Sequence, residues 1–263
     1  MVANVDIHHS AIIEDGAEIG DGTSVGPFCF VGSKVRLGQN VELKSHVVIK
    51  GDTFLGDENT VFPFAVLGEI PQDKKFNGES TSLKIGNRNQ IREHVTINVG
   101  TKGGGGITKV GNDGLFMAGC HIAHDAQVGD NVILVNNASL AGHCIIEDNV
   151  IVGGLSGVHQ FVRIGEGAII GAVTMVTNDV IPYGLVQAPR GELDGLNLVG
   201  LKRKGVPRAD IMALRAAFQT LSQGDGTFQD RAQKLTDDSD SEYVEKIVSF
   251  VLGHSDRSFL TPR

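Results

Sequence analysis

The sequence contains no tryptophan and only two tyrosines among its 263 residues. Its apolar mass comes mainly from valine, isoleucine and leucine, and 35 glycines accompany them. Small and β-branched side chains suit closely stacked strands better than a core built around large aromatic rings. The composition therefore favours a strand-rich fold with tight turns.

Cysteine is scarce as well, with only Cys29, Cys120 and Cys144 and no CxxC spacing. An odd count without that spacing argues against both a disulfide framework and a zinc ribbon.

Positive charge is in deficit, because the formal net charge is −8. A general binder of nucleic acids or of anionic membranes needs a basic surface, so neither partner is expected. No segment approaches the roughly 18 to 20 apolar residues of a membrane span. The start of the chain, MVANVDIHHSAII, also lacks the basic region of a signal peptide. We expect a soluble, cytoplasmic protein with no integral membrane segment.

What the chain does have is a period of six. An aliphatic residue, or once a phenylalanine, recurs at every sixth position in three runs, which are Ile7 to Leu67, Ile85 to Ile97 and Val110 to Val176. This spacing fits neither a helix nor one long alternating strand. It predicts short strands separated by corners and stacked into coils, because no single strand could bury its apolar face alone.

All three cysteines fall four positions after one of these recurring apolar residues, in a slot that otherwise holds small or apolar side chains. We therefore expect buried, unreactive thiols.

The repeat also sets the domain organisation. It is interrupted at residues 68–84 and 98–109, where we expect projecting loops on a binding face, and it ends near residue 181. Helical spacing follows at residues 211–221, 227–235 and 241–252. The expected division is a β-helix over residues 1–182, followed by a linker and an α-helical C-terminal domain over residues 183–263.

Four of the nine histidines, His121, His124, His143 and His159, lie within 39 residues of one another. If a coil contains three hexads, residues eighteen apart lie on successive coils, and these histidines share one edge. Such a cluster suits either a zinc site or general-base chemistry near neutral pH. Asp125 is placed to orient the ring of His124, as a carboxylate does in a catalytic triad.

Segments such as IGDGTS, VGPFCF, VGDNVI and IGEGAI resemble the hexapeptide-repeat family. The resemblance implies a mainly β fold, namely a left-handed parallel β-helix with three hexads per coil, and a homotrimer. Over nearly the whole chain, the segments HIAHDAQVG, LAGH, VHQF, QDKKFNGE and GLKRKG resemble one branch, the UDP-N-acetylglucosamine O-acyltransferases.

This second resemblance implies an activity. An (R)-3-hydroxyacyl chain would move from acyl carrier protein to the 3-hydroxyl of UDP-N-acetylglucosamine, as the first step of lipid A synthesis, without a metal or other cofactor. His124 would be the general base, Asp125 its partner, and the Gly142 amide the oxyanion donor. The implied substrate-binding residues are Gln72, Asp73, Lys75, His121, His143, His159, Gln160, Asn197, Arg203 and Lys204.

Two positions depart from the pattern of the best-known members of that branch. Val199 stands where they carry an acidic residue near the nucleotide. Ala172 stands where long-chain members have glycine at the floor of the acyl groove, so we expect a chain shorter than 3-hydroxytetradecanoyl.

Several alternatives stay open from the sequence. The N-acyltransferase of the same pathway resembles a longer chain with an extra N-terminal domain, whereas the hexads begin at Ile7 here. A zinc-dependent enzyme like carbonic anhydrase, a CoA-dependent acetyltransferase and a non-catalytic structural solenoid also use hexads. The choice between UDP-N-acetylglucosamine and its 3-amino analogue as acceptor is open too.

Overall fold

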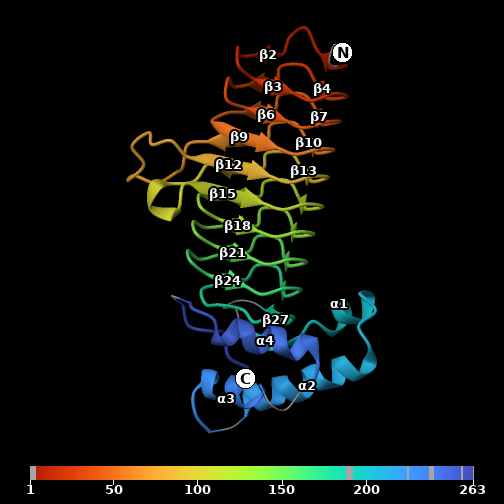
Figure 1. Cartoon of the computed structure of the whole chain (residues 1–263), viewed down its shortest axis with the longest axis vertical. Helices are drawn as coiled ribbons and strands as arrows, with labels where there is room; N and C mark the ends of the chain where they lie inside the picture. Colours follow the sequence, from red (N-terminus) through yellow and green to blue (C-terminus); the bar gives the residue numbers. More distant parts are fainter. Residues whose placement is uncertain (1–3, 188–191, 224, 237–239, 256, 263) are drawn as a thin grey trace.

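The computed structural model describes residues 4–187, 192–223, 225–236, 240–255 and 257–262. Its strands form a long column of stacked coils, and four helices gather at the C-terminal end of that column (Figure 1). Among the residues described, no helix combines the length and the apolar character that crossing a membrane requires.

Three sheets form the sides of the column, and most strands are two residues long. The first sheet contains, in order, β1 (Asp6–Ile7), β4 (Ser24–Val25), β7 (Glu42–Leu43), β10 (Thr60–Val61), β13 (Gln90–Ile91), β16 (Leu115–Phe116), β19 (Ile133–Leu134), β22 (Ile151–Val152), β25 (Ile169–Ile170), β27 (Gly184–Gln187) and β28 (Glu192–Leu196). The second contains β2 (Ile12–Ile13), β5 (Phe30–Val31), β8 (Val48–Ile49), β11 (Val66–Glu69), β14 (Thr96–Asn98), β17 (His121–Ile122), β20 (Ser139–Leu140), β23 (Gly157–Val158) and β26 (Met175–Val176). The third contains β3 (Glu18–Ile19), β6 (Arg36–Leu37), β9 (Asp52–Leu55), β12 (Ser82–Ile85), β15 (Ile107–Val110), β18 (Gln127–Val128), β21 (Ile145–Ile146) and β24 (Arg163–Ile164).

The strand register follows the repeat. Ile122 pairs with Leu140, and Leu140 pairs with Val158, so one coil is three hexads long. From β1 to β26, consecutive strands therefore lie in different sheets, and each sheet pairs every third strand in parallel. The predicted fold class, a left-handed parallel β-helix with a small helical part, is confirmed.

The aliphatic residues of the hexads form the core. From Val25 to Val176 every one of them is buried, and most are fully inaccessible. Ile7 at the N-terminal end is 40% exposed, because the described chain places no coil beneath it. The three cysteines are buried and free, as predicted. Burial raises the pKa of Cys120 to about 11 and that of Cys144 to about 12, so both thiols stay protonated near neutral pH.

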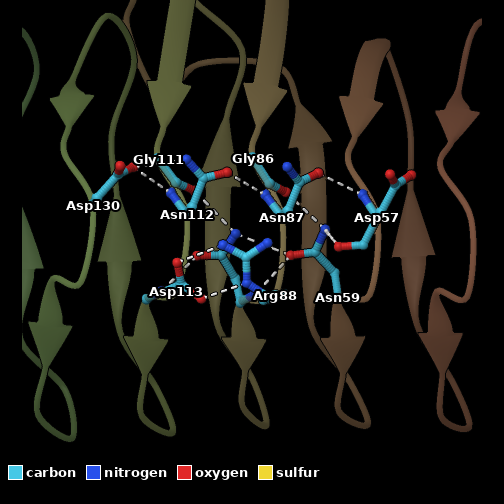
Figure 2. A network of polar contacts seen from close by, with 11 residues as sticks. Asp57, Asn59, Gly86, Asn87, Arg88, Gly111, Asn112, Asp113 and Asp130 are labelled. Carbon is cyan, nitrogen blue, oxygen red and sulfur yellow. Dashed lines mark hydrogen bonds and ion pairs between the residues drawn. The ribbon is translucent and has the colours of Figure 1, made fainter.

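Corners between the third and first sheets carry a ladder of polar side chains (Figure 2). At each turn the side chain one coil further on accepts a hydrogen bond from a backbone amide. Asn112 Oδ1 accepts from the Asn87 amide at 2.8 Å, and Asp130 Oδ1 accepts from the Asn112 amide at 2.7 Å. Outside this ladder, Arg88 forms a two-bond ion pair with Asp113. These contacts satisfy turn amides that the parallel sheets leave unpaired.

The two interruptions of the repeat leave the column between β11 and β12 and between β14 and β15, and both project from the same side (Figure 1). The second contains a single-turn 3₁₀ helix, η1 (Lys102–Gly104), which ends at Gly105 with a φ of 96°. Glycine adopts this left-handed conformation at little cost, so the GGGG run permits a tight fold.

At the C-terminal end, β27 pairs in parallel with β25 and antiparallel with β28. The helices follow as α1 (Leu198–Arg203), α2 (Arg208–Ser222), α3 (Phe228–Lys234) and α4 (Glu242–Leu252). A capping box between Thr227 and Asp230 starts α3. The six-residue α1 is too short to show helical periodicity in the sequence. A domain boundary near residue 182 remains a proposal, since β27 continues the first sheet beyond it.

Candidate active site

The histidine edge lies at the corner between the second and third sheets. His124 and Asp125 follow β17, Gly142 and His143 follow β20 one coil later, and Phe161 follows β23. Backbone hydrogen bonds fix this stacking, since the His143 amide donates to the His124 carbonyl at 3.0 Å. The predicted convergence of His124 and His143 on one edge is therefore present.

Asp125 is the most enclosed polar group of the edge, because its side chain has no exposed surface. Its carboxylate accepts hydrogen bonds from the Thr101 amide at 2.8 Å and the Thr101 hydroxyl at 2.6 Å. Nδ1 of His124 lies 2.8 Å from Oδ2 of the same carboxylate. An ionised carboxylate only accepts, so Nδ1 of His124 carries the proton, and Nε2 keeps a free lone pair.

Glycines of the second loop pack directly on this carboxylate. A Cβ placed on Gly104 would lie 2.1 Å from Cγ of Asp125, and one on Gly100 would lie 2.8 Å from its Oδ1. Both separations are far below van der Waals contact, so larger residues would displace the loop or the carboxylate. The glycine run therefore lets the loop close over Asp125 and exclude water from it.

Gly142 lies against the His124 ring, since a Cβ there would be 2.5 Å from Cε1 of that ring. Its backbone N–H has no hydrogen-bond partner within the described residues, although Gly142 is buried. Asn87 occupies the same position of the turn at the corner shown in Figure 2. Its amide donates to the side chain of Asn112. Gly142 thus has a free donor beside the free nitrogen of His124.

Two more histidines line the edge in the neutral form. Burial lowers the pKa of His143, opposed by Asp125, whose Oδ2 lies 3.8 Å from His143 Nδ1. Its ring stacks on Phe161 with 4.5 Å between centroids. Burial also lowers the pKa of His121, whose Nδ1 lies 2.7 Å from the Thr96 hydroxyl.

Two cavities meet at this edge. One of about 480 Å³ is mostly apolar, and its lining includes six predicted site residues: Gln72, His121, His124, Gly142, His159 and Gln160. The other, of about 890 Å³, lies under the first loop and is lined by three more predicted residues, Asp73, Lys75 and His143, together with Thr101 and Phe161. The edge therefore has one apolar and one more polar compartment.

The remaining predicted residues lie elsewhere in the subunit. Asn197 caps α1, accepting from the Gly200 amide at 2.9 Å and donating to the Gly167 carbonyl at 3.0 Å. Lys204 Nζ lies 3.9 Å from Glu166, and Arg203 is exposed on α1. Ala172 is exposed at the turn after β25. None of these four lines either cavity of the described chain, and their predicted roles stay predictions.

A metal ion could be held by one group at the same edge. His124, Asp125 and His143 each offer a ligand atom, and these atoms lie within 4.8 Å of one another. Imidazole and carboxylate are zinc ligands, so this donor set suits zinc. Binding there would compete with the hydrogen bond between His124 and Asp125.

Sequence reasoning missed four residues that hold the edge together: Thr96, Thr101, Thr108 and Arg257. Thr108 accepts from the Asp125 amide at 2.8 Å, and Arg257 Nη2 lies 3.0 Å from His159 Nδ1. These side chains lie 17 to 98 residues from their partners. Neither the hexad spacing nor any local motif marks them.

The column of hexads with a buried histidine and carboxylate at one edge is the architecture of a hexapeptide-repeat protein, and two family models assign it to the transferases. A family model described as bacterial transferase hexapeptide (six repeats) matches residues 16–51. A second, described as UDP N-acetylglucosamine O-acyltransferase, domain 2, matches residues 179–260.

Similar proteins identify the branch. An acyl-[acyl-carrier-protein]–UDP-N-acetylglucosamine O-acyltransferase of Paracoccus denitrificans is 66% identical over 202 residues, 77% of each chain. One of Agrobacterium fabrum is 43% identical over 264 aligned positions, covering 100% of this chain and 97% of its own. The solved structure of LpxA from Acinetobacter baumannii matches with a TM-score of 0.94 and 37% identity, over 97% of this chain and 99% of that one. The chain belongs to the UDP-N-acetylglucosamine O-acyltransferase family.

Proposed function

We propose that this protein transfers an (R)-3-hydroxyacyl chain from acyl carrier protein to the 3-hydroxyl of UDP-N-acetylglucosamine, the first step of lipid A synthesis. The observation that carries this proposal is the His124–Asp125 pair, whose free Nε2 lies against Gly142, a residue whose amide has no partner among the described residues. Membership of the family supplies the substrates, and the edge supplies a base and an oxyanion donor for acyl transfer.

The proposed reaction uses both groups in turn. His124 Nε2 takes the proton of the sugar hydroxyl while its oxygen attacks the thioester carbonyl carbon. Asp125, held by Thr101, stabilises the resulting imidazolium. The Gly142 N–H stabilises the oxyanion of the tetrahedral intermediate. That intermediate collapses with cleavage of the carbon–sulfur bond, and the departing thiolate takes the proton from His124. A general base of this kind contributes roughly 10²- to 10⁴-fold in rate.

The two cavities suit the two parts of the chemistry. We assign the more polar one, with Asp73, Lys75 and His143, to the sugar and the approach of the donor. The apolar one suits the hydroxyacyl chain, with Gln72, His121, His159 and Gln160 as the polar contacts at its walls. Asn197, Arg203 and Lys204 then contact the nucleotide from a neighbouring coil or subunit of a homotrimer. Because the proposed donor is acyl carrier protein, we propose that the protein acts in the cytoplasm.

A transfer assay tests the function directly. Purified protein is incubated with UDP-N-acetylglucosamine and hydroxyacyl carrier proteins, and the acylated sugar nucleotide is quantified by mass spectrometry. Wild type should form product, His124→Ala should lose at least about 100-fold in rate, and the exposed His9→Ala control should be unaffected. No product from wild type, with this sugar or with its 3-amino analogue, would overturn the proposal.

Zinc dependence separates the metal alternative. If His124, Asp125 and His143 bind a functional zinc ion, chelation should abolish the activity and added zinc should restore it. The acyltransferase proposal expects transfer to survive exhaustive chelation unchanged. Stoichiometric zinc that is required for turnover would favour the carbonic anhydrase-like alternative.

A donor panel in the same assay tests chain length. We propose that the methyl group of Ala172 limits the acyl groove, so turnover should peak with a chain shorter than 3-hydroxytetradecanoyl. Ala172→Gly should move the optimum to a longer chain. Ala172 is exposed in the single subunit, so this role needs a neighbouring subunit to complete the groove. Maximal wild-type turnover with the 3-hydroxytetradecanoyl donor would contradict it.

A further inference from the structure

His159 has a partner that comes from the far end of the chain. Arg257 lies beyond α4, 98 residues further on, and its Nη2 lies 3.0 Å from Nδ1 of the His159 ring. No carboxylate of the described residues lies within ion-pair distance of Arg257. The contact with His159 is therefore the polar interaction that this guanidinium makes near the apolar cavity.

The described residues of the C-terminal tail, 253–255 and 257–262, are fastened to the last coil by hydrogen bonds to Asp179, which itself forms an ion pair with Arg163. Asp179 is fully buried and lies 2.7 Å from Arg163 Nε. The Asp179 amide donates to the Ser258 carbonyl at 2.9 Å, and the Leu260 amide donates to the Asp179 carbonyl at 2.7 Å. The Arg257 amide donates to the Ser255 hydroxyl, which itself donates to Asp179. Residues on both sides of Arg257 in the sequence are therefore bonded to Asp179, and these bonds hold Arg257 in place.

We infer that Arg257 is a positioning residue that holds His159 as a neutral ring with its proton on Nε2. A guanidinium donates hydrogen bonds and never accepts them, so the contact requires a lone pair on Nδ1. Nδ1 also lies 3.3 Å from the Gln160 carbonyl, a contact that would need a proton on Nδ1. The guanidinium contact is the shorter of the two, and a guanidinium can only donate, so this contact decides the tautomer.

This inference rests on the proposed function for its consequence. His159 lines the apolar cavity together with His124 and Gln160. With Nδ1 engaged by Arg257, Nε2–H is left to donate to an oxygen atom of the bound substrates. His124 presents a lone pair at Nε2 and His159 presents a proton, so the two rings do complementary work in one cavity. Asp125, which accepts from Nδ1 of His124, and Arg257, which donates to Nδ1 of His159, have opposite charge. The first therefore leaves a lone pair on Nε2 of its ring, and the second leaves a proton there.

Histidine nitrogen NMR tests the tautomer without any substrate. In ring-labelled wild type, the His159 signals, assigned through their loss in His159→Gln, should show an unprotonated Nδ1 and a protonated Nε2. Arg257→Met should give a mixture of tautomers, Arg257→Lys should keep the wild-type pattern, and Arg215→Met on α2 should change nothing. A wild-type Nδ1–H signal, or a pattern unchanged in Arg257→Met, would overturn the inference.

A double-mutant cycle tests the consequence for catalysis. Arg257→Met should lower kcat/KM roughly tenfold, the effect of losing one hydrogen bond of about 1.4 kcal/mol, with an unchanged thermal transition. His159→Gln, which keeps an N–H near the Nε2 position, should retain more activity than His159→Asn. In the His159→Gln background, Arg257→Met should have little further effect. Additive losses would assign Arg257 a merely structural role.

The two readouts separate the two proposals. If wild type transfers no acyl chain but His159 shows the expected tautomer, the proposed function fails and the role of Arg257 stands. If transfer occurs but the tautomer and the cycle do not respond to Arg257, the function stands and the inference fails.

Discussion

His124 and Asp125 are neighbours in the sequence, and neighbouring side chains of a strand point to opposite faces. Here they meet, because Asp125 adopts a φ of 61° at the corner that follows β17. That left-handed turn brings its carboxylate to Nδ1 of the preceding ring. A non-glycine residue in this conformation is uncommon, and aspartate tolerates it better than most. The backbone of one residue thus creates the pair.

Two adjacent glycines in the second loop allow a matched test of this pair. A Cβ on Gly104 would collide with Cγ of Asp125 at 2.1 Å, whereas a Cβ on Gly103 would meet nothing within 4 Å. Both lie in η1, so the backbone cost of alanine is similar. We expect Gly104→Ala to lower kcat by at least about tenfold through displacement of Asp125, and Gly103→Ala to retain wild-type activity. Equal activity of both variants in the transfer assay would contradict this packing.

Acid should destabilise the protein partly through His121. Burial lowers its pKa in the folded state, so between that pKa and the ordinary value near 6.5 the unfolded chain binds a proton that the folded chain does not. Stability is therefore lost as the pH falls below about 6.5. Urea denaturation is measured at pH 7.5 and at pH 5.5. The urea midpoint of His121→Gln should fall less between the two pH values than that of wild type. The exposed His9→Gln control should behave like wild type, and an equal loss in His121→Gln would exclude this contribution.

At the scale of elements, the hexad rule predicts the coils because it depends on local chemistry. An aliphatic residue every sixth position must be buried, and three hexads per coil then fix the register, as the pairing of Ile122 with Leu140 confirms. The rule fails where the chain leaves the column. The loop with Gly104 was expected to project from a binding face, yet it also buries Asp125. Its fold depends on a contact between coils that no spacing encodes.

The candidate site divides in the same way. Counting by eighteen places His124 and His143 together, because both belong to the repeat. It cannot place Thr101, which lies in an interruption, or Arg257, which lies in the tail. Their partners are chosen by how a loop and a terminus dock on the column. Sequence therefore predicts the His124–Asp125 pair that carries the proposed chemistry, and it misses Thr101 and Arg257, which hold Asp125 and His159 in place.

The turns of the column also depend on two buried asparagines, since the Asn89 side chain donates to Asn59 Oδ1 at 2.9 Å. Asn89 is 1% exposed, accepts from the Gly114 amide at 2.8 Å and donates to the Gly111 carbonyl at 3.0 Å. Asn89→Leu keeps the number and branching of the side-chain heavy atoms but leaves the Gly114 amide and the Gly111 carbonyl buried without these partners. We expect a loss of about 2 to 4 kcal/mol in the free energy of unfolding, measured by denaturant titration. Gln90, the exposed residue next to Asn89, gives the control. Gln90→Leu should change the free energy of unfolding by less than about 0.5 kcal/mol.

At the scale of the whole molecule, large apolar side chains are exposed along the corner between the first and second sheets. Phe28, Phe64, Leu155 and Val173 are between 49% and 66% exposed, and Met175 on the adjoining strand β26 is 61% exposed. The Phe64 ring also stacks on that of His94 and contacts the tilted ring of His46. Exposed apolar side chains gathered on one corner of a folded protein mark an interaction site. We expect it to be covered by a second copy of the chain.

A cyclic trimer would place this apolar corner of one subunit against the histidine edge of the next and supply the missing wall for Ala172. Sedimentation equilibrium should therefore give three times the 27.9 kDa chain mass.

Leu155 at this corner allows a test by substitution. It has a φ of 58°, a conformation that aspartate tolerates, so Leu155→Asp adds a charge at the corner without new backbone strain. Burying that charge at an interface is costly, so the variant should sediment as a single chain and lose transfer activity together. Met212→Glu on α2, where Met212 is 55% exposed away from the corner, should keep both mass and activity. A wild-type protein that sediments at 27.9 kDa while transferring acyl chains would show that one subunit completes the site.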